Sequence, residues 1–193
     1  RHSFPTRRSS DLQSMWQQHL LLRGEALGRF DLLLHGIVKD PAMLHYLDNA
    51  SSRKTAPNEN FARELLELFT LGESSSGGGY TEQDIKEAAR ALTGYSINAE
   101  TGEFVFRQPM HDFGSKTILG RTGNFDGTQL VDVLLAQPQT ATHIVRKLWL
   151  EFVSPEPIAS EVTRIAKLFR DSGYEISVAL RALLLCDAFW ADA

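Results

Sequence analysis

The chain has 193 residues, of which 42% are hydrophobic and 23% are charged, and its formal net charge is −4. This composition is typical of a globular domain that buries a core without disulfide or metal support. A single cysteine, Cys186, excludes an internal disulfide and a cysteine-based zinc site, and its apolar surroundings predict a buried thiol. The acidic balance argues against a nucleic-acid partner, and no run approaches the roughly 18 apolar residues of a membrane span.

The first residues are treated separately because they match a laboratory sequence. Residues 2–12 read "HSFPTRRSSDL", which is the translation of a common short-read sequencing adapter in this frame. They also lack the apolar stretch of a secretory signal. We therefore predict that residues 1–12 are an artefact, and that residues 13–193 are native sequence whose own N-terminal region is missing.

Helical spacing dominates from about Gln13 onward. Apolar residues recur three and four positions apart, which predicts helices with a break at Gly24. These residues are Trp16, Leu20, Leu27, Phe30, Leu33, Leu34, Ile37 and Val38. Start signals for further helices are Asp40 before Pro41, Thr81 three residues before Asp84, Asp126 three residues before Gln129, and Pro138.

One segment has the character of strands. Phe104 and Phe106 alternate with other residues after the turn sequence "ETG", which predicts one short β-hairpin near residues 96–107. The glycine-rich stretch 109–127 that follows is expected to be irregular, with "GRTGNFDG" as a turn. The fold class predicted for the chain is therefore mainly α, a multi-helical globular domain with one small hairpin.

The stretch 58–72, "NENFARELLELFTLG", concentrates amides, carboxylates and one arginine in a helical pattern. Its apolar residues fall on one face of an ideal helix and its polar residues on the other. The polar residues are Asn58, Glu59, Asn60, Arg63, Glu64 and Glu67. One interpretation is an amphipathic helix that Asn58 or Asn60 caps, that ends at Gly72, and that carries ion pairs at i,i+4 spacing. The other is a polar network that fixes a core or lines a site.

A second candidate is "HDFGSK", residues 111–116, in the glycine-rich segment after the hairpin. His111 is suited to act as a base or a metal ligand, Asp112 to bind a metal or orient a histidine, and Lys116 to hold an anion. Adjacent side chains need not converge, however, and a metal site requires three or four ligands. A binding loop and an ordinary structural loop therefore both remain open.

Other known site patterns are absent. The remaining histidines show neither an HExxH motif nor a paired spacing, and we expect structural roles for them. The sequence also has no Walker A lysine, no GxSxG elbow and no set of kinase motifs.

The order of several segments identifies a family. These segments are "DPAMLHYLDN", "PNENFARELLELFTLG", "YTEQDIKEAARALTGY", "HDFGSKTILG", "KLWLEFV" and "LRALLLCDAFW". Together they resemble the DUF1800 family of bacterial proteins, a domain of unknown function, over about residues 26–190. The resemblance implies that this chain corresponds to a C-terminal portion. In the family a helical region with an aromatic and histidine-rich segment precedes that portion.

The resemblance also implies where a site would lie. The polar residues of 58–64 and the pair His111–Asp112 match the family's characteristic motifs. One hypothesis is a metal-assisted or acid–base hydrolase of exported substrates, with His111, Asp112 and Glu64 as candidate catalytic residues. Asn58, Glu59, Asn60, Arg63, Glu67 and Lys116 would then be binding or network residues. Its site would be completed by the missing N-terminal region, and the metal-assisted version would use a divalent metal as its cofactor, whereas the sequence alone leaves the cofactor unknown.

The alternative is a non-enzymatic helical scaffold or binding protein, in which the polar residues form a structural network. Family resemblance further suggests export or a periplasmic location, and a sulfatase-like protein encoded nearby as a partner. The sequence itself specifies neither a reaction nor a substrate.

Overall fold

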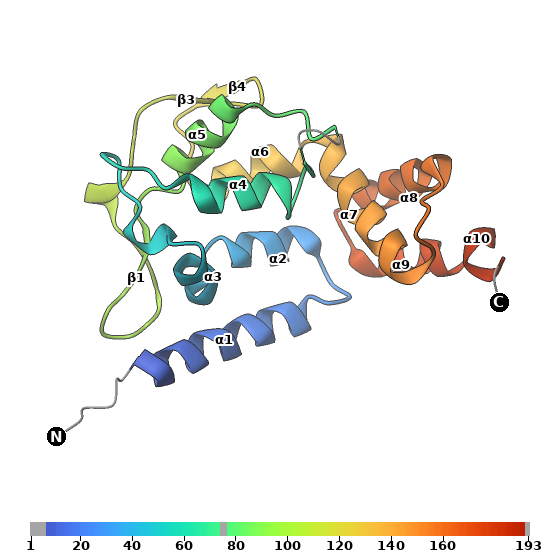
Figure 1. Ribbon diagram of the computed structural model, residues 1–193, viewed down its shortest axis with the longest axis horizontal. Helices are drawn as coiled ribbons and strands as arrows, with labels where there is room; N and C mark the ends of the chain where they lie inside the picture. Colours follow the sequence, from blue (N-terminus) through green and yellow to red (C-terminus); the bar gives the residue numbers. More distant parts are fainter. Residues whose placement is uncertain (1–6, 74–76, 192–193) are drawn as a thin grey trace.

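A computed structural model describes residues 7–73 and 77–191 of the chain. The fold is mainly helical, as the sequence predicts, and it carries two small antiparallel hairpins (Figure 1). The helices are α1 (Arg7–Gly24), α2 (Phe30–Ile37), α3 (Pro41–Tyr46), α4 (Glu59–Glu67), α5 (Glu82–Ala91), α6 (Gly127–Leu135), α7 (Pro138–Phe152), α8 (Ala159–Asp171), α9 (Ile176–Leu184) and α10 (Asp187–Trp190). The short 3-10 turns are η1 (Asn49–Ser51) and η3 (Gln108–Met110), and the strands are β1 (Tyr95–Ile97), β2 (Phe104–Phe106), β3 (Lys116–Ile118) and β4 (Arg121–Gly123).

Helices α3 to α7 begin at the predicted start signals. Asp40 accepts a hydrogen bond from the Met43 amide at the start of α3, and Asn58 caps α4 by accepting from the Asn60 amide. The capping boxes of α5 and α6 are both complete, and α7 begins at Pro138. Each signal and its effect lie within four residues of one another, which is why the sequence reveals them.

Helices α4, α5 and α6 form the centre of the molecule, and α2 lies beside them (Figure 1). The apolar faces of α4 and α5 meet through small and large side chains that are completely buried. They are Phe61, Ala62, Leu65, Leu66, Ile85, Ala88, Ala89 and Leu92. The alanines of α5 allow the two helices to approach closely, and the apolar area removed from water stabilises this centre. Most of the apolar face predicted for residues 58–72 is therefore buried, but Leu68 is 47% exposed, and the helix ends at Glu67 and not at Gly72.

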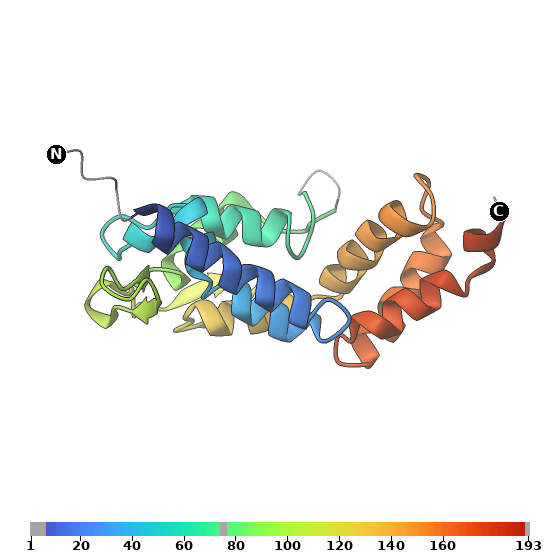
Figure 2. The same cartoon turned by 90° about the horizontal axis from the view of Figure 1, so that it is seen from below.

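Helix α1 is present as predicted and ends at Gly24, the expected break. It lies along one side of the molecule (Figures 1 and 2), and its apolar residues Trp16 and Leu20 are exposed at 58% and 44%. The half-buried positions toward the body are Ser14, Gln18 and Leu21. The apolar spacing therefore marks the helix but not the face that it buries. The artefact predicted for residues 1–12 falls partly outside the described residues, because 1–6 are not described, and residues 7–12 begin α1.

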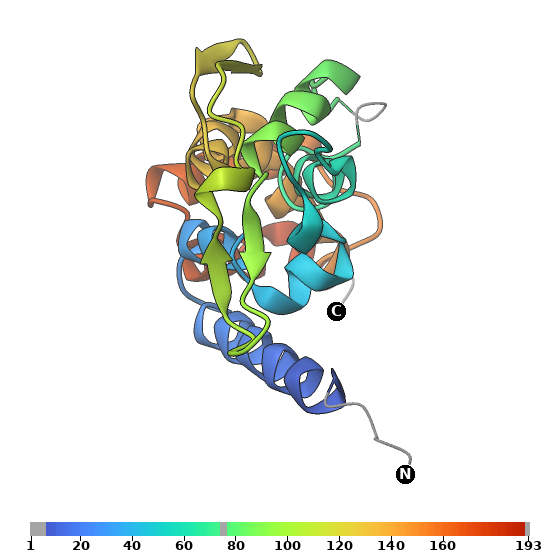
Figure 3. The same cartoon turned by 90° about the vertical axis from the view of Figure 1, so that its left-hand side faces the viewer.

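The predicted hairpin is present, with Tyr95 paired to Phe106 and Ile97 to Phe104. Figure 3 shows its tip beside α1. A second hairpin, β3–β4, occupies the segment expected to be irregular. Its two-residue turn, Leu119–Gly120, has φ values of +49° and +77°, which the tight hairpin turn requires. Leucine is an unusual residue at the first turn position, so no Asn-Gly or Asp-Gly turn signal marks this hairpin. The Leu119 amide donates to the Asp84 carboxylate at 2.7 Å, which holds the turn on α5.

Helices α7, α8 and α9 pack on one another at the end of the molecule away from the hairpins (Figure 1). They join the centre through the C-terminal end of α4. There the Leu68 carbonyl accepts hydrogen bonds from His143 at 3.2 Å and from Lys147 at 3.1 Å. Cys186 is buried, as predicted. Among the described residues, no helix combines the length and apolar character needed to cross a membrane.

Candidate functional site

Helix α4 begins with two asparagines that tie it to α3. The Asn58 side chain donates to the Asp48 carbonyl at 2.9 Å, and Asn60 reaches the Leu47 carbonyl at 3.5 Å. Both carbonyls lie just beyond the C-terminal end of α3, where helix carbonyls lack partners within the helix. The two amides therefore join the end of one helix to the start of another.

Arg63 lies in the middle of the polar arc and points to α5. Its two terminal nitrogens each donate to one carboxylate oxygen of Glu82 at 2.8 Å. The predicted pair with Glu59 is present at 3.7 Å, whereas no ion pair joins Arg63 to Glu67. The hydrogen bond to Glu82 raises the pKa of Arg63, and the same contact lowers the pKa of Glu82. The strongest partner of Arg63 is thus 19 residues away, on the neighbouring helix.

Glu64 and Glu67 complete the arc. Both are half-buried, and neither side chain has a hydrogen bond or ion pair within the described part of the chain. Glu64 and Glu67 are therefore the two members of the arc that the described residues leave available for a further contact.

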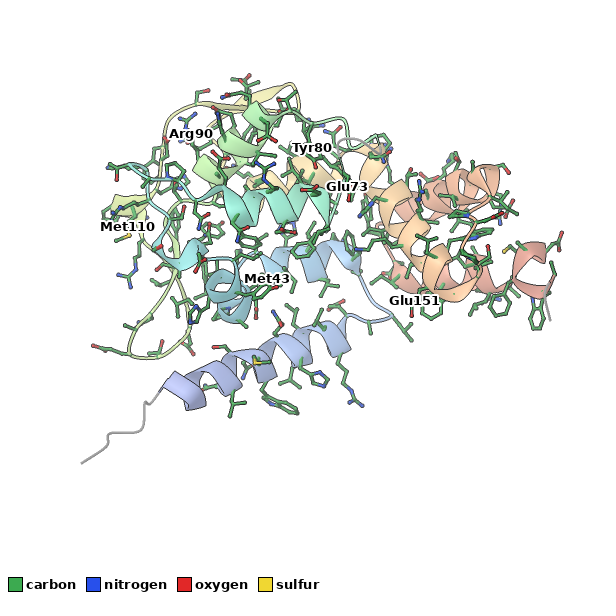
Figure 4. The ribbon with its side chains drawn as sticks, in the orientation of Figure 1. Met43, Glu73, Tyr80, Arg90, Met110 and Glu151 are labelled. Atoms are coloured by element: carbon green, nitrogen blue, oxygen red, sulfur yellow. The ribbon has the colours of Figure 1, made fainter. Side chains whose placement is uncertain are left out.

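The loop from His111 to Lys116 is held on α5 by an ion pair. Arg90 donates to both carboxylate oxygens of Asp112, from Nε at 2.7 Å and from Nη2 at 3.2 Å. Arg90 also contacts Glu87 at 2.7 Å. The Arg90 hydrogen bond lowers the pKa of Asp112, and the Gly114 amide donates to the same carboxylate. Arg90 and Met110 lie at the end of the molecule opposite Glu151 of α7 (Figure 4).

Lys116 is buried, with 1% of its surface exposed. Its ammonium donates to the carbonyls of Asp112 and Gly114, at 2.5 and 3.0 Å, and lies 3.4 Å from Asn124 Oδ1. Burial lowers its pKa. Three oxygen acceptors match the three donors of an ammonium group, so Lys116 closes the loop upon itself.

His111 is also buried, at 2% exposure, and one hydrogen bond fixes its tautomer. Its Nδ1 lies 2.8 Å from the Thr93 carbonyl, which can only accept, so Nδ1 carries the proton. The Thr93 hydroxyl cannot supply a competing proton, because it donates to the Arg90 carbonyl at 2.6 Å. Nε2 therefore carries the lone pair. Burial lowers the pKa of His111, which favours this neutral form.

The Nε2 atom has no hydrogen-bond partner among the described residues. Asn49 Oδ1 is the one fully covered side-chain oxygen or nitrogen in that part of the chain that lacks a partner. Nε2 therefore keeps access to solvent, although the ring is almost entirely covered. Phe106 and Phe113 pack edge to face against this ring, with centroid distances of 5.2 and 4.7 Å.

The model of the family described as "Protein of unknown function (DUF1800)" matches residues 2–193. The chain belongs to the DUF1800 family. This confirms the family that the order of the motifs indicates. Searches of curated proteins and of solved structures found no match.

The two motifs of the DUF1800 chain are separate in their contacts. Asn58, Asn60 and Arg63 bind α3 and α5, whereas the loop 111–116 binds the C-terminal half of α5 and Thr93. No hydrogen bond or ion pair joins Glu64 to His111 or Asp112 in the residues described. A site shared by Glu64 and His111 stays a prediction.

Two DUF1800 residues that the sequence analysis did not single out hold the loop in place. Arg90 binds Asp112, and Thr93 receives the Asp112 amide on its hydroxyl at 2.8 Å and His111 on its carbonyl. Their partners lie 18 to 22 positions along the chain, so no local spacing reveals them. The one usable signal was the arginine in the last turn of α5, directly after Ala88 and Ala89.

A metal site is not complete in this part of the DUF1800 protein. In residues 7–73 and 77–191, no group of three or more His, Cys, Asp or Glu side chains is arranged to hold a metal ion. His111 Nε2 has the tautomer that a metal ligand needs. Asp112 is already engaged by Arg90. The described residues thus offer one suitable donor where three or four are required.

Proposed function

We propose that this DUF1800 chain carries a proton-transfer centre of a hydrolase, with His111 as the base. The observation that carries the proposal is the state of His111: a covered, neutral imidazole whose Nδ1 proton is held by Thr93 and whose Nε2 lone pair has access to solvent. Because Nε2 keeps access to solvent and no described residue donates to it, a ligand or reacting group that donates a proton can reach its lone pair.

The chemistry follows from the tautomer. Nε2 would accept a proton from a water molecule or a substrate hydroxyl as that oxygen attacks, and the Thr93 carbonyl would stabilise the resulting imidazolium through Nδ1–H. The lowered pKa keeps the ring neutral near pH 7, so the base is ready to act. Such a base typically accelerates a reaction by about 10²–10⁴-fold. In this proposal Asp112 and Lys116 position the loop and take no part in proton transfer.

The remaining groups of the site would come from protein outside the described residues. Glu64, half-buried and without a partner there, is a candidate to meet them from the α4 side. The donors present do not make a metal site, so no metal step enters the proposal. Export, bacterial origin, an N-terminal region that completes the site and a sulfatase-like partner also belong to the proposal, because family resemblance alone supports them.

A second candidate function is a non-enzymatic helical scaffold or binding protein. The observation in its favour is that Asn58, Arg63, Asp112 and Lys116 each connect separate elements or close a loop. In this version the motif residues hold helices in place. His111 would then fill space between Phe106 and Phe113 with a water molecule on Nε2.

The substitution His111→Asn distinguishes the two functions. An asparagine amide can replace Nδ1–H toward Thr93, but it has no atom equivalent to Nε2. In the protein as the organism produces it, we expect kcat for p-nitrophenyl acetate and related neutral esters to fall by about 10²-fold or more. The control His45→Asn, at an exposed position on α3, should leave kcat unchanged. Equal turnover by His111→Asn, or binding of a protein partner without any turnover, would favour the scaffold.

A further inference from the structure

We propose that the His111 site takes a neutral ligand, one that donates an O–H or N–H group to Nε2 and lays an apolar ring face on Phe113. This inference rests on the proposed function and adds the substrate class. It separates neutral hydroxyl compounds from phosphate and sulfate esters, which need a cation to hold their charge.

Two cations near His111, Arg90 on α5 and Lys116 in its own loop, are already engaged. Arg90 makes two hydrogen bonds to Asp112 and one to Glu87. Lys116 is covered and directs its ammonium to three oxygens of its own loop. An anionic ligand would have to break these contacts before either cation could reach it. Separating a buried charge from its partner costs free energy. A phosphate or sulfate group would therefore gain little binding free energy here.

Arg107, the next cation along this segment, is engaged as well. Its Nε donates to the Ser96 hydroxyl at 3.2 Å and its Nη2 to the Ile97 carbonyl at 3.2 Å. These contacts hold its guanidinium on the β1–β2 hairpin.

The carboxylates near His111 oppose an anion further. Asp126 and Asp112 both act on the imidazole in the sense that raises its pKa, which shows that their negative charges reach the ring. Lys116 acts in the opposite sense. An anion at Nε2 would also meet a lone pair, because that nitrogen is the acceptor of the neutral tautomer. A neutral donor meets neither obstacle.

Phe113 supplies the apolar part of the site. Its ring stands nearly perpendicular to the imidazole, at 83°, and yet 57% of the residue is exposed. A large aromatic side chain beside an available lone pair can hold a flat apolar face, such as a phenyl ring or the C–H face of a sugar. The Phe113 ring and the Nε2 lone pair together define a ligand with one polar edge and one apolar face.

Phenol, phenyl phosphate and phenyl sulfate test the inference, because they share one ring and differ in charge. Each is titrated into the isotopically labelled protein at pH 7.5 while the His111 ring nitrogens are followed by NMR. We expect phenol to shift the Nε2 resonance, and the two anions to bind at least tenfold more weakly. Phe113→Ala should weaken phenol binding about tenfold. The control Phe152→Ala, at a phenylalanine of α7 that is 48% exposed, should not change it.

The outcomes separate this inference from the proposed function. Tighter binding of phenyl phosphate or phenyl sulfate than of phenol would overturn the neutral class while leaving His111 as a base. Absence of any phenol shift, or an unchanged affinity in Phe113→Ala, would also overturn it. Normal phenol binding together with normal turnover by His111→Asn would overturn the proposed function, and the neutral binding site would remain.

Discussion

Asp112 is paired with Arg90, and it makes no hydrogen bond to the histidine that precedes it in the sequence. The guanidinium of Arg90 holds both carboxylate oxygens of Asp112, at 2.7 and 3.2 Å, while His111 directs Nδ1 to the Thr93 carbonyl. Two adjacent residues that could have formed a catalytic pair thus serve different contacts. The carboxylate positions the loop, and the histidine is oriented by a backbone oxygen instead.

The Arg90–Asp112 pair predicts a pH-dependent loss of stability. Arg90 holds the pKa of Asp112 below its usual range, so the pair contributes stability above about pH 4, the unfolded value, and loses it as pH falls through the lower folded pKa. Asp112→Asn should cost about 1–3 kcal/mol of unfolding free energy at pH 7. Urea unfolding at pH 7 and pH 3 measures both effects.

The difference between Asp112→Asn and the unchanged protein should shrink at pH 3, because pH 3 lies below the ordinary pKa of this carboxyl in the unfolded chain, and the stabilisation decreases from there toward the lower folded pKa. Asp171→Asn provides the control, because its pair with Lys167 is largely exposed and should contribute little at either pH. A difference that stays constant from pH 7 to pH 3 would argue against a role for the charge of Asp112.

Lys116 predicts a loss of stability that does not depend on an ion pair. Lys116→Met keeps much of the buried side-chain length but removes three donors, which leaves the Asp112 and Gly114 carbonyls covered without a partner. We expect a cost of about 1–3 kcal/mol, measured by urea unfolding. Lys86→Met, at an exposed position on α5, should be close to neutral. Equal effects of the two substitutions would contradict the closed loop.

A substitution at Gly94 tests how tightly the His111 loop packs on the end of α5. Its φ is +80°, and an added Cβ would lie 2.8 Å from the Arg107 carbonyl oxygen and 3.1 Å from the His111 amide nitrogen. Gly102 also has a positive φ, of +74°, but its Cβ would meet nothing within 4 Å. Gly102→Ala should therefore cost only the backbone strain of about 1–2 kcal/mol.

Gly94→Ala adds the steric contact to the same strain, so it should lower the unfolding free energy clearly more than Gly102→Ala. It should also move the NMR resonances of His111. Similar losses for the two alanine variants would mean that the loop can move away from Gly94 at no cost.

Much of this fold could be predicted because its signals act over short distances. Asn58 caps its own helix, Asp40 precedes Pro41, and the capping box of Thr81 lies within one turn. The apolar face of α4 follows from helical spacing alone. The β3–β4 hairpin could not be predicted in this way, because Leu119 is an unfavourable turn residue that Asp84 supports from another element.

The candidate site was harder to predict for the same physical reason. The sequence offers Glu59 and Glu67 as partners for Arg63 one helical turn away, yet its two-point partner is Glu82 on α5. The role of His111 depends on Thr93, 18 positions earlier. The types of side chain were enough to identify the candidate residues of the site. Only the packing of α4 on α5 could decide which of them meet.

On helix α1 we expect the substitution of a polar residue to lower the unfolding free energy more than the substitution of a large apolar one, which reverses the usual order. Trp16 is 58% exposed and stacks only on His19, whereas Gln18 donates to the Asp40 carboxylate at 2.7 Å. Burial already raises the pKa of Asp40, so this carboxylate depends on the donors around it. Removing a polar residue should therefore destabilise the chain more than removing a tryptophan.

We expect Trp16→Ala to change the unfolding free energy by less than about 0.5 kcal/mol, as for other exposed positions. Gln18→Ala should cost about 1–2 kcal/mol, because Asp40 loses a hydrogen bond in a half-buried setting. Urea unfolding of both variants at pH 7 measures the order, and acrylamide quenching reports whether Trp16 is exposed. A larger loss for Trp16→Ala, with a protected indole, would instead place that ring in a core.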